Sequence, residues 1–143
     1  MRVGLGVIAF AAAVTALVAP PATARDTCTR KTLKVSQVSG RVVTPPYGRA
    51  EEPVPGAAVK VSKCRGAECS VVAEAVTDEA GRYAFTGIGP GEYQVEAFAP
   101  SAGRLAVHVR VNKSSGKKRR EIVLVLEPGG PNVCFGWAEL RQT

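Results

Sequence analysis

Residues 77–97 read TDEAGRYAFTGIGPGEYQVEA, and this stretch decides the fold. Asp78 and Gly81 have the spacing of the first and fourth positions of a type I turn. The run Gly-Ile-Gly-Pro-Gly at 87–91 predicts a second turn, because proline has no N–H to donate and glycine tolerates positive φ. On either side of this run, apolar and polar residues alternate with the period of a half-buried strand. The stretch therefore predicts two strands and two turns.

Five further segments of the chain have the composition of short strands. Turn signals separate them at intervals of roughly 8–12 residues, and no helical period follows residue 24. The pattern predicts an all-β protein, a seven-stranded antiparallel β-sandwich. The further strands are expected at residues 35–44, 57–62, 70–77, 104–112 and 122–126, the last of them covered on both faces.

The N-terminus has the composition of an export signal. Arg2 precedes a continuous apolar run over residues 3–19, and Ala22-Thr23-Ala24 fits the small-x-small pattern of signal cleavage. We interpret the segment as a cleaved signal peptide, with an uncleaved anchor as the alternative. The protein is then exported, periplasmic or extracellular, without a transmembrane span after cleavage. The expected organisation is signal peptide 1–24, irregular lead-in 25–37, sandwich 38–126 and C-terminal tail 127–143.

All four cysteines of the chain follow the signal segment. An even number of cysteines in an exported chain indicates disulfide bonds. Three pairings are open, and we favour Cys64–Cys69, which flanks a four-residue loop, with Cys28–Cys134 joining the ends of the domain. A zinc site is the alternative for four cysteines.

Four segments follow one another in the order and spacing of a known family. They are Ser39-Gly40-Arg41-Val42-Val43, Pro53-Val54-Pro55-Gly56-Ala57-Ala58-Val59, Thr77-Asp78 with Gly81-Arg82-Tyr83-Ala84-Phe85, and Gly89-Pro90-Gly91-Glu92-Tyr93-Gln94-Val95. Over residues 38–126 the chain resembles the carboxypeptidase regulatory-like domain, a prealbumin-like sandwich of seven strands. The resemblance implies a non-catalytic accessory or binding module, and some relatives in the wider fold bind carbohydrate. We expect a secreted, stand-alone bacterial member with additional cysteines and an additional tail containing Trp137.

The sequence favours a protein without catalytic residues, metal or cofactor. A metallopeptidase needs at least two histidines, and His108 is the only one. No carboxylate near His108 in the sequence is placed to orient it as in a Ser-His-Asp site. Asp78 and Glu79 alone are too few for a calcium shell. An intramolecular isopeptide bond needs a buried acid, but the candidate Glu96 falls on the polar parity of its strand.

The positive charge of the chain is concentrated in residues 104–120, the basic segment. Its seven cations account for the whole formal excess of +7, with no acid among them. We predict that the segment forms a hairpin that contacts an anionic partner, such as an envelope polysaccharide, lipid head groups or an acidic protein. The alternative is a solvated hairpin whose cations prevent edge aggregation, and nucleic acid is not expected because no aromatic residues interleave with the cations. The cations are Arg104, Arg110, Lys113, Lys117, Lys118, Arg119 and Arg120.

Exposed aromatic residues provide a second binding hypothesis. Trp137 in the tail and Tyr47 in a proline-containing loop are candidates for stacking on sugar rings. For Trp137 we favour the other interpretation, that it caps the hydrophobic core. The oligomeric state is not indicated by the sequence.

Overall fold

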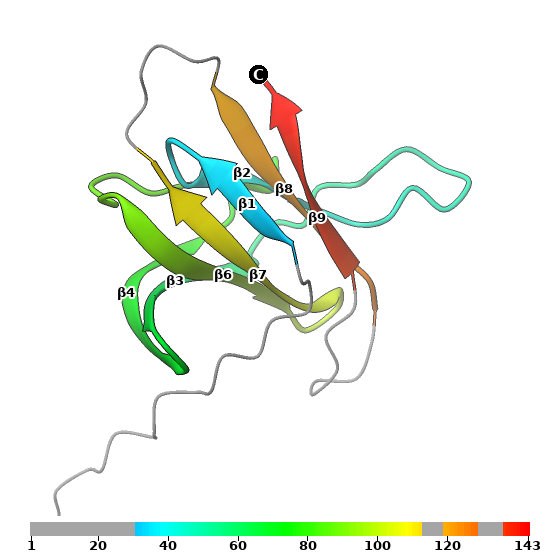
Figure 1. Cartoon of the computed structure of the whole chain (residues 1–143). Helices are drawn as coiled ribbons and strands as arrows, with labels where there is room; N and C mark the ends of the chain where they lie inside the picture. Colours follow the sequence, from blue (N-terminus) through cyan, green and yellow to red (C-terminus); the bar gives the residue numbers. More distant parts are fainter. Residues whose placement is uncertain (1–30, 113–118, 129–135) are drawn as a thin grey trace, which may run out of the picture.

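The computed structural model describes residues 31–112, 119–128 and 136–143. These residues form nine strands and no helix (Figure 1). The strands are β1 (Thr32–Val35), β2 (Ser39–Val43), β3 (Ala58–Arg65), β4 (Glu68–Val76), β5 (Arg82–Ala84), β6 (Gly91–Ala99), β7 (Gly103–Val111), β8 (Arg120–Leu126) and β9 (Gly136–Gln142).

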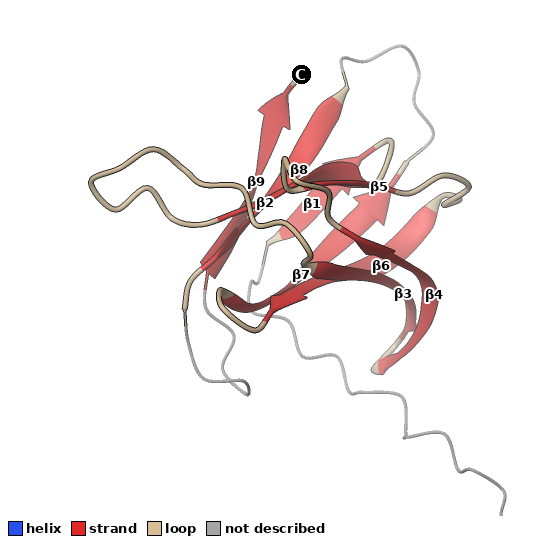
Figure 2. Cartoon of the chain, turned by 180° about the vertical axis from the view of Figure 1, so that it is seen from behind, coloured by secondary structure: helices blue, strands red, loops and turns tan. Residues whose placement is uncertain are grey.

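The strands form two sheets that pack as a β-sandwich (Figure 2). One sheet has the order β1-β7-β6-β3-β4, and the other has the order β5-β2-β8-β9. The predicted all-β sandwich is confirmed. The strand number of seven is wrong, since the described residues contain nine strands. The prediction of purely antiparallel pairing is also wrong, because β1 is parallel to β7 and β2 is parallel to β8.

The two additional strands lie at the ends of the described chain. β1 falls inside the expected irregular lead-in, where Leu33 and Val35 are buried in the core. β9 falls inside the tail, where Ala138 and Leu140 pack against the core. The strand expected over 35–44 is present as β2 but begins later, at Ser39, because the chain changes sheet between β1 and β2.

The core lies between the two sheets and follows the alternation of each strand. In β8 the three residues Ile122, Leu124 and Leu126 are fully buried and face the core. Val123 and Val125 are also fully buried, but they belong to a separate small cluster. The prediction that this strand is covered on both faces is therefore confirmed.

The turn at residues 78–81 forms as predicted. The Gly81 N–H donates to the Asp78 carbonyl at 2.9 Å, and Gly81 has a φ of 71°. The Asp78 carboxylate accepts from the N–H groups of Ala80 and Arg82, both at 2.9 Å. Both hydrogen bonds of this carboxylate therefore hold the turn.

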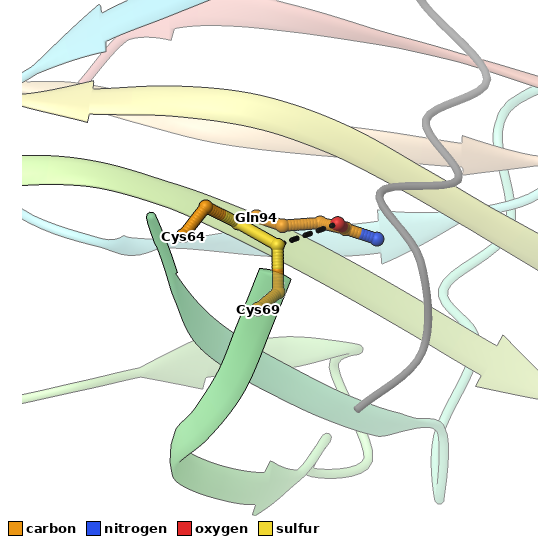
Figure 3. The surroundings of a disulfide bond; sticks show 3 residues. All are labelled: Cys64, Cys69 and Gln94. Carbon is orange, nitrogen blue, oxygen red and sulfur yellow. Dashed lines mark hydrogen bonds between the residues drawn. A yellow bond between two sulfur atoms is a disulfide. The ribbon is translucent and has the colours of Figure 1, made fainter. Parts of the chain in front are cut away.

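The predicted disulfide between Cys64 and Cys69 is present at the end of the β3–β4 hairpin (Figure 3). The two residues are directly opposite each other in the register. Cys69 is buried, and its Sγ atom lies 3.6 Å from Oε1 of Gln94 on β6. Because a disulfide sulfur carries no hydrogen, this is a packing contact and not a bond donated by sulfur. Cys28 and Cys134 lie outside the described residues, so their pairing stays a prediction.

Removing this disulfide is expected to have a moderate effect on stability. The double variant Cys64→Ser/Cys69→Ser should lose about 2 kcal/mol of unfolding free energy, because the bond closes a short loop in the unfolded chain. Urea denaturation without reductant measures the difference from wild type. Equal midpoints for the two proteins would show that the bond adds nothing to stability.

Candidate functional site

The basic segment is not a hairpin in the structure. β7 belongs to the five-stranded sheet and β8 to the four-stranded sheet, so the segment crosses between the sheets. Arg104 and Arg110 lie on β7, six positions apart, which is about 20 Å along a strand. Arg119 and Arg120 are exposed at the start of β8. The remaining cations, Lys113, Lys117 and Lys118, lie outside the described residues.

The neighbouring strand β6 supplies carboxylates to the cations of β7. Arg104 Nη2 lies 2.8 Å from Glu96 Oε2, and Arg110 Nη2 lies 2.5 Å from Glu92 Oε1. The basic segment has no acid in its own sequence, but cross-strand pairing places acids beside these two arginines. The pairing with Arg104 also shows that Glu96 faces away from the core, as predicted. The two carboxylates of β6 reduce the local positive charge on β7.

The outer face of the four-stranded sheet, the face turned away from the core, carries Trp137. The register aligns Val43 of β2, Val125 of β8 and Trp137 of β9 in one row. Trp137 is 37% exposed, whereas its neighbour Ala138 packs against the core. Because successive side chains of a strand point to opposite faces, Trp137 does not cap the core. The interpretation that Trp137 caps the core between the two sheets is therefore wrong, and Trp137 lies in one row with Val43 and Val125 of the second buried cluster.

Tyr47 lies at the same end of this outer face. It belongs to the β2–β3 loop, residues 44–57, which projects on the side of the four-stranded sheet (Figures 1 and 2). Tyr47 is 71% exposed, and its hydroxyl donates to Oε1 of Glu127. Glu127 follows β8 directly, two positions beyond Val125, the residue opposite Trp137. Tyr47 thus contacts a carboxylate that follows the end of β8 at which Trp137 is paired.

Arginine and glutamate side chains connect the loop to the strands. Arg141 donates from Nη1 to Glu51 Oε2 at 2.7 Å and from Nε to Glu139 Oε1 at 2.6 Å. Arg41 donates from Nη2 to Glu121 Oε1 at 2.8 Å. The β2–β3 loop is therefore attached to β9 through Glu51 and to the end of β8 through Tyr47.

These contacts change the acidity of the groups that make them. The hydrogen bond from Arg141 lowers the pKa of Glu51. The hydrogen bonds to Glu51 and Glu139 raise the pKa of Arg141. The hydrogen bond to Glu127 raises the pKa of Tyr47. At neutral pH, Glu51 is therefore ionised, and Tyr47 keeps the proton that it donates.

Residues 37–125 match the carboxypeptidase regulatory-like domain family. The chain belongs to this family. The matched region extends from just before β2 to the penultimate residue of β8, so β1 and β9 lie outside it. A search of curated proteins found no match. Within the family-matched region, the β2–β3 loop provides Tyr47, whereas Trp137 comes from β9 beyond it.

The described part of this family member has neither a candidate metal site nor a membrane-spanning helix. It contains no group of three or more His, Cys, Asp or Glu side chains that could hold a metal ion. The same residues include no helix with the length and hydrophobicity of a membrane span. His108 is half-buried on β7, opposite Gln94 of β6, away from the sheet that carries Trp137.

Several residues of the outer face were not predicted from the sequence. Glu51 is far from Arg141 in the chain, and Tyr47 is far from Glu127, and the path of the β2–β3 loop brings each pair into contact. The alternation of Trp137, Glu139 and Arg141 with Ala138 and Leu140 is the one sequence signal that indicates a strand with an aromatic outer face.

Acidification is expected to loosen the β2–β3 loop. Because the pKa of Glu51 is lowered in the folded protein, its contact with Arg141 stabilises the loop fully at pH values above the ordinary pKa of glutamate. This stabilisation is lost as the pH falls through the lowered pKa. The pair is partly exposed, so its contribution is at most about 1 kcal/mol. Trp137 is the only tryptophan, so acrylamide quenching of its fluorescence reports on this face. Quenching of wild type should increase as the pH falls below 4.5.

The variant Glu51→Gln provides the matched control for this titration. It should show the stronger quenching already at pH values where wild type is protected, and little further change on acidification. Identical titrations of the two proteins would rule out the Glu51–Arg141 contact as the attachment of the loop.

Proposed function

We propose that this protein is an exported, non-catalytic binding module that recognises carbohydrate on the outer face of the four-stranded sheet. The observation that carries the proposal is the location of Tyr47 and Trp137, both exposed at one end of this face. Flat aromatic side chains provide large contact areas for the apolar C–H faces of sugar rings, and their polar groups bond to water or hydroxyls. Glu127 supplies a hydrogen-bond acceptor beside Tyr47.

The other carboxylates of this face favour a binding role over a hydrolytic one. A glycosidase needs one carboxyl group that keeps its proton near neutral pH. Glu51 and Glu139 contact Arg141, and Glu121 contacts Arg41. The hydrogen bond from Arg141 lowers the pKa of Glu51, which makes this carboxyl group a poor general acid.

Two features support an exported location, periplasmic or extracellular. The Cys64–Cys69 disulfide fits an oxidising compartment, since such bonds are rare in the cytosol. Residues 1–24 have the order of charged, apolar and small residues that is typical of a signal peptide.

Replacing Trp137 by alanine tests this function. Full burial of a large apolar side chain is worth roughly 1.5–3 kcal/mol, so we expect a loss of about 10- to 100-fold in affinity for the saccharide that wild type binds best. Titration calorimetry with soluble oligosaccharides measures the affinity. Phe98→Ala is the matched control, because Phe98 is also 37% exposed but lies on the five-stranded sheet. Equal losses in both variants, or no saccharide binding by wild type, would reject the proposal.

Contact of the basic segment with an anionic partner is a second candidate, which the exposure of Arg119 and Arg120 favours. Exposed charges are screened within about 8 Å at physiological ionic strength, so capture of an envelope fraction through them should decrease with salt. It should also be lost when Lys117, Lys118, Arg119 and Arg120 are replaced by glutamate. Capture that is indifferent to both changes would exclude this segment as a binding site.

A further inference from the structure

The carboxylate of Glu127 differs from the other carboxylates of the outer face in its partner. Within residues 31–112, 119–128 and 136–143, Glu51 and Glu121 pair with arginines, whereas the hydrogen bond of Glu127 comes from the neutral hydroxyl of Tyr47. In that part of the chain no Lys or Arg forms an ion pair with Glu127. No cation of the described residues therefore neutralises the negative charge of Glu127.

The charge of Glu127 lies beside Tyr47, at the end of β8 where Trp137 is paired. Tyr47 contacts Glu127 directly. Val125 is directly opposite Trp137, and Glu127 follows two positions later, just after the last paired residue, Leu126. A sugar ring that stacks on Tyr47 would thus have its substituents beside the carboxylate.

The charge of Glu127 is separated from the ion pairs of this face. Arg141 contacts two carboxylates, Glu51 and Glu139, but in the register it is paired with Glu121, six positions before Glu127, so this group lies nearer the other end of β8. The exposed Arg120 also lies at the opposite end of β8, seven positions from Glu127, which is about 23 Å. This distance is more than twice the Debye length at physiological ionic strength. Arg120 therefore does not repel a cationic ligand from Glu127.

We propose that the site selects a cationic saccharide, an amino-sugar oligomer with free, protonated amines, over its N-acetylated counterpart. This inference rests on the proposed carbohydrate function and assigns Glu127 as the residue that determines specificity. The ammonium group forms a charge-assisted hydrogen bond with Glu127 and lies against the faces of Tyr47 and Trp137, which attract cations. An N-acetyl group has no charge and places bulk where the ammonium would bind, so it loses both interactions.

The test compares hexamers of glucosamine and of N-acetylglucosamine at about pH 5.5, where a sugar amine is protonated and a glutamate is ionised. Titration of the full chain with intact disulfides should give at least tenfold tighter binding of the glucosamine hexamer. Glu127→Gln should remove this preference and leave the affinity for the N-acetylated hexamer unchanged. Glu92→Gln, on the other sheet, is the matched control and should keep the preference.

The outcomes separate this inference from the proposed function. If both hexamers bind with dependence on Trp137 but Glu127→Gln changes nothing, carbohydrate binding stands and the assignment of Glu127 fails. If neither hexamer nor any other saccharide binds, the proposed function fails with it. If a lysine hexapeptide binds as tightly as the glucosamine hexamer, with the same dependence on Glu127, the site recognises cations in general and the amino-sugar assignment is overturned.

Discussion

Replacing Gly40 by alanine is expected to lower the free energy of unfolding by about 4 kcal/mol or more, enough to prevent folding. A Cβ atom at this position would lie 1.9 Å from the carbonyl oxygen and 2.7 Å from the nitrogen of Ile122. These are backbone atoms of β8, which pairs with β2 through four successive residues. Because backbone cannot move aside as a flexible side chain can, the two central strands of the sheet would have to separate.

Circular dichroism and urea denaturation measure this effect. Gly89→Ala is the matched control, since a Cβ atom there meets nothing within 4 Å. The control should fold with stability close to that of wild type. A Gly40→Ala protein as stable as the Gly89→Ala protein would show that β2 and β8 are not packed as closely as described.

The variant Thr77→Val is expected to lose about 2–4 kcal/mol of unfolding free energy. The buried Thr77 hydroxyl accepts from the Ala57 N–H at 2.8 Å and donates to the Val54 carbonyl at 2.6 Å. Valine has nearly the same shape but leaves both backbone groups buried without these partners, at a cost of roughly 1–3 kcal/mol each. Through these two hydrogen bonds, the hydroxyl joins the end of the β2–β3 loop to Thr77, the residue that follows β4.

Thr77→Ser separates the hydroxyl from the methyl group. Serine keeps both hydrogen bonds and loses only one buried methyl group, so its loss should be about 1 kcal/mol. Urea midpoints of the two variants give the comparison. Equal losses would assign the stabilisation to packing of the methyl group and not to the hydroxyl.

Local patterns were sufficient to predict most strands of the sandwich. The turn chemistry of Asp78 and Gly81 and the alternation around Tyr83 and Tyr93 are local properties, and the structure confirms them. β1 was missed because only Leu33 and Val35 carry its pattern. Its strand conformation depends on parallel pairing with β7, more than 70 residues away in sequence, and no local signal encodes such a pairing.

The candidate site shows the same division between local and long-range information. Tyr47 and Trp137 are the candidates for exposed aromatic residues in the sequence, although a core cap is the favoured interpretation of Trp137, and both are exposed. Their common location depends on Glu127 and on the register of β8 with β9, which the sequence does not carry. The charge of Arg104 was overestimated for a related reason, because its partner Glu96 belongs to another strand.

β9 lies outside the family-matched region, so the matched scaffold does not include all of the proposed ligand site. Residues 37–125 provide the shared framework and Tyr47, whereas Trp137 comes from an addition to that framework. The aromatic surface of this chain is therefore divided between a loop inside the matched region and a strand outside it. Grafting β9 together with the β2–β3 loop onto another member should transfer the aromatic surface without redesign of its core.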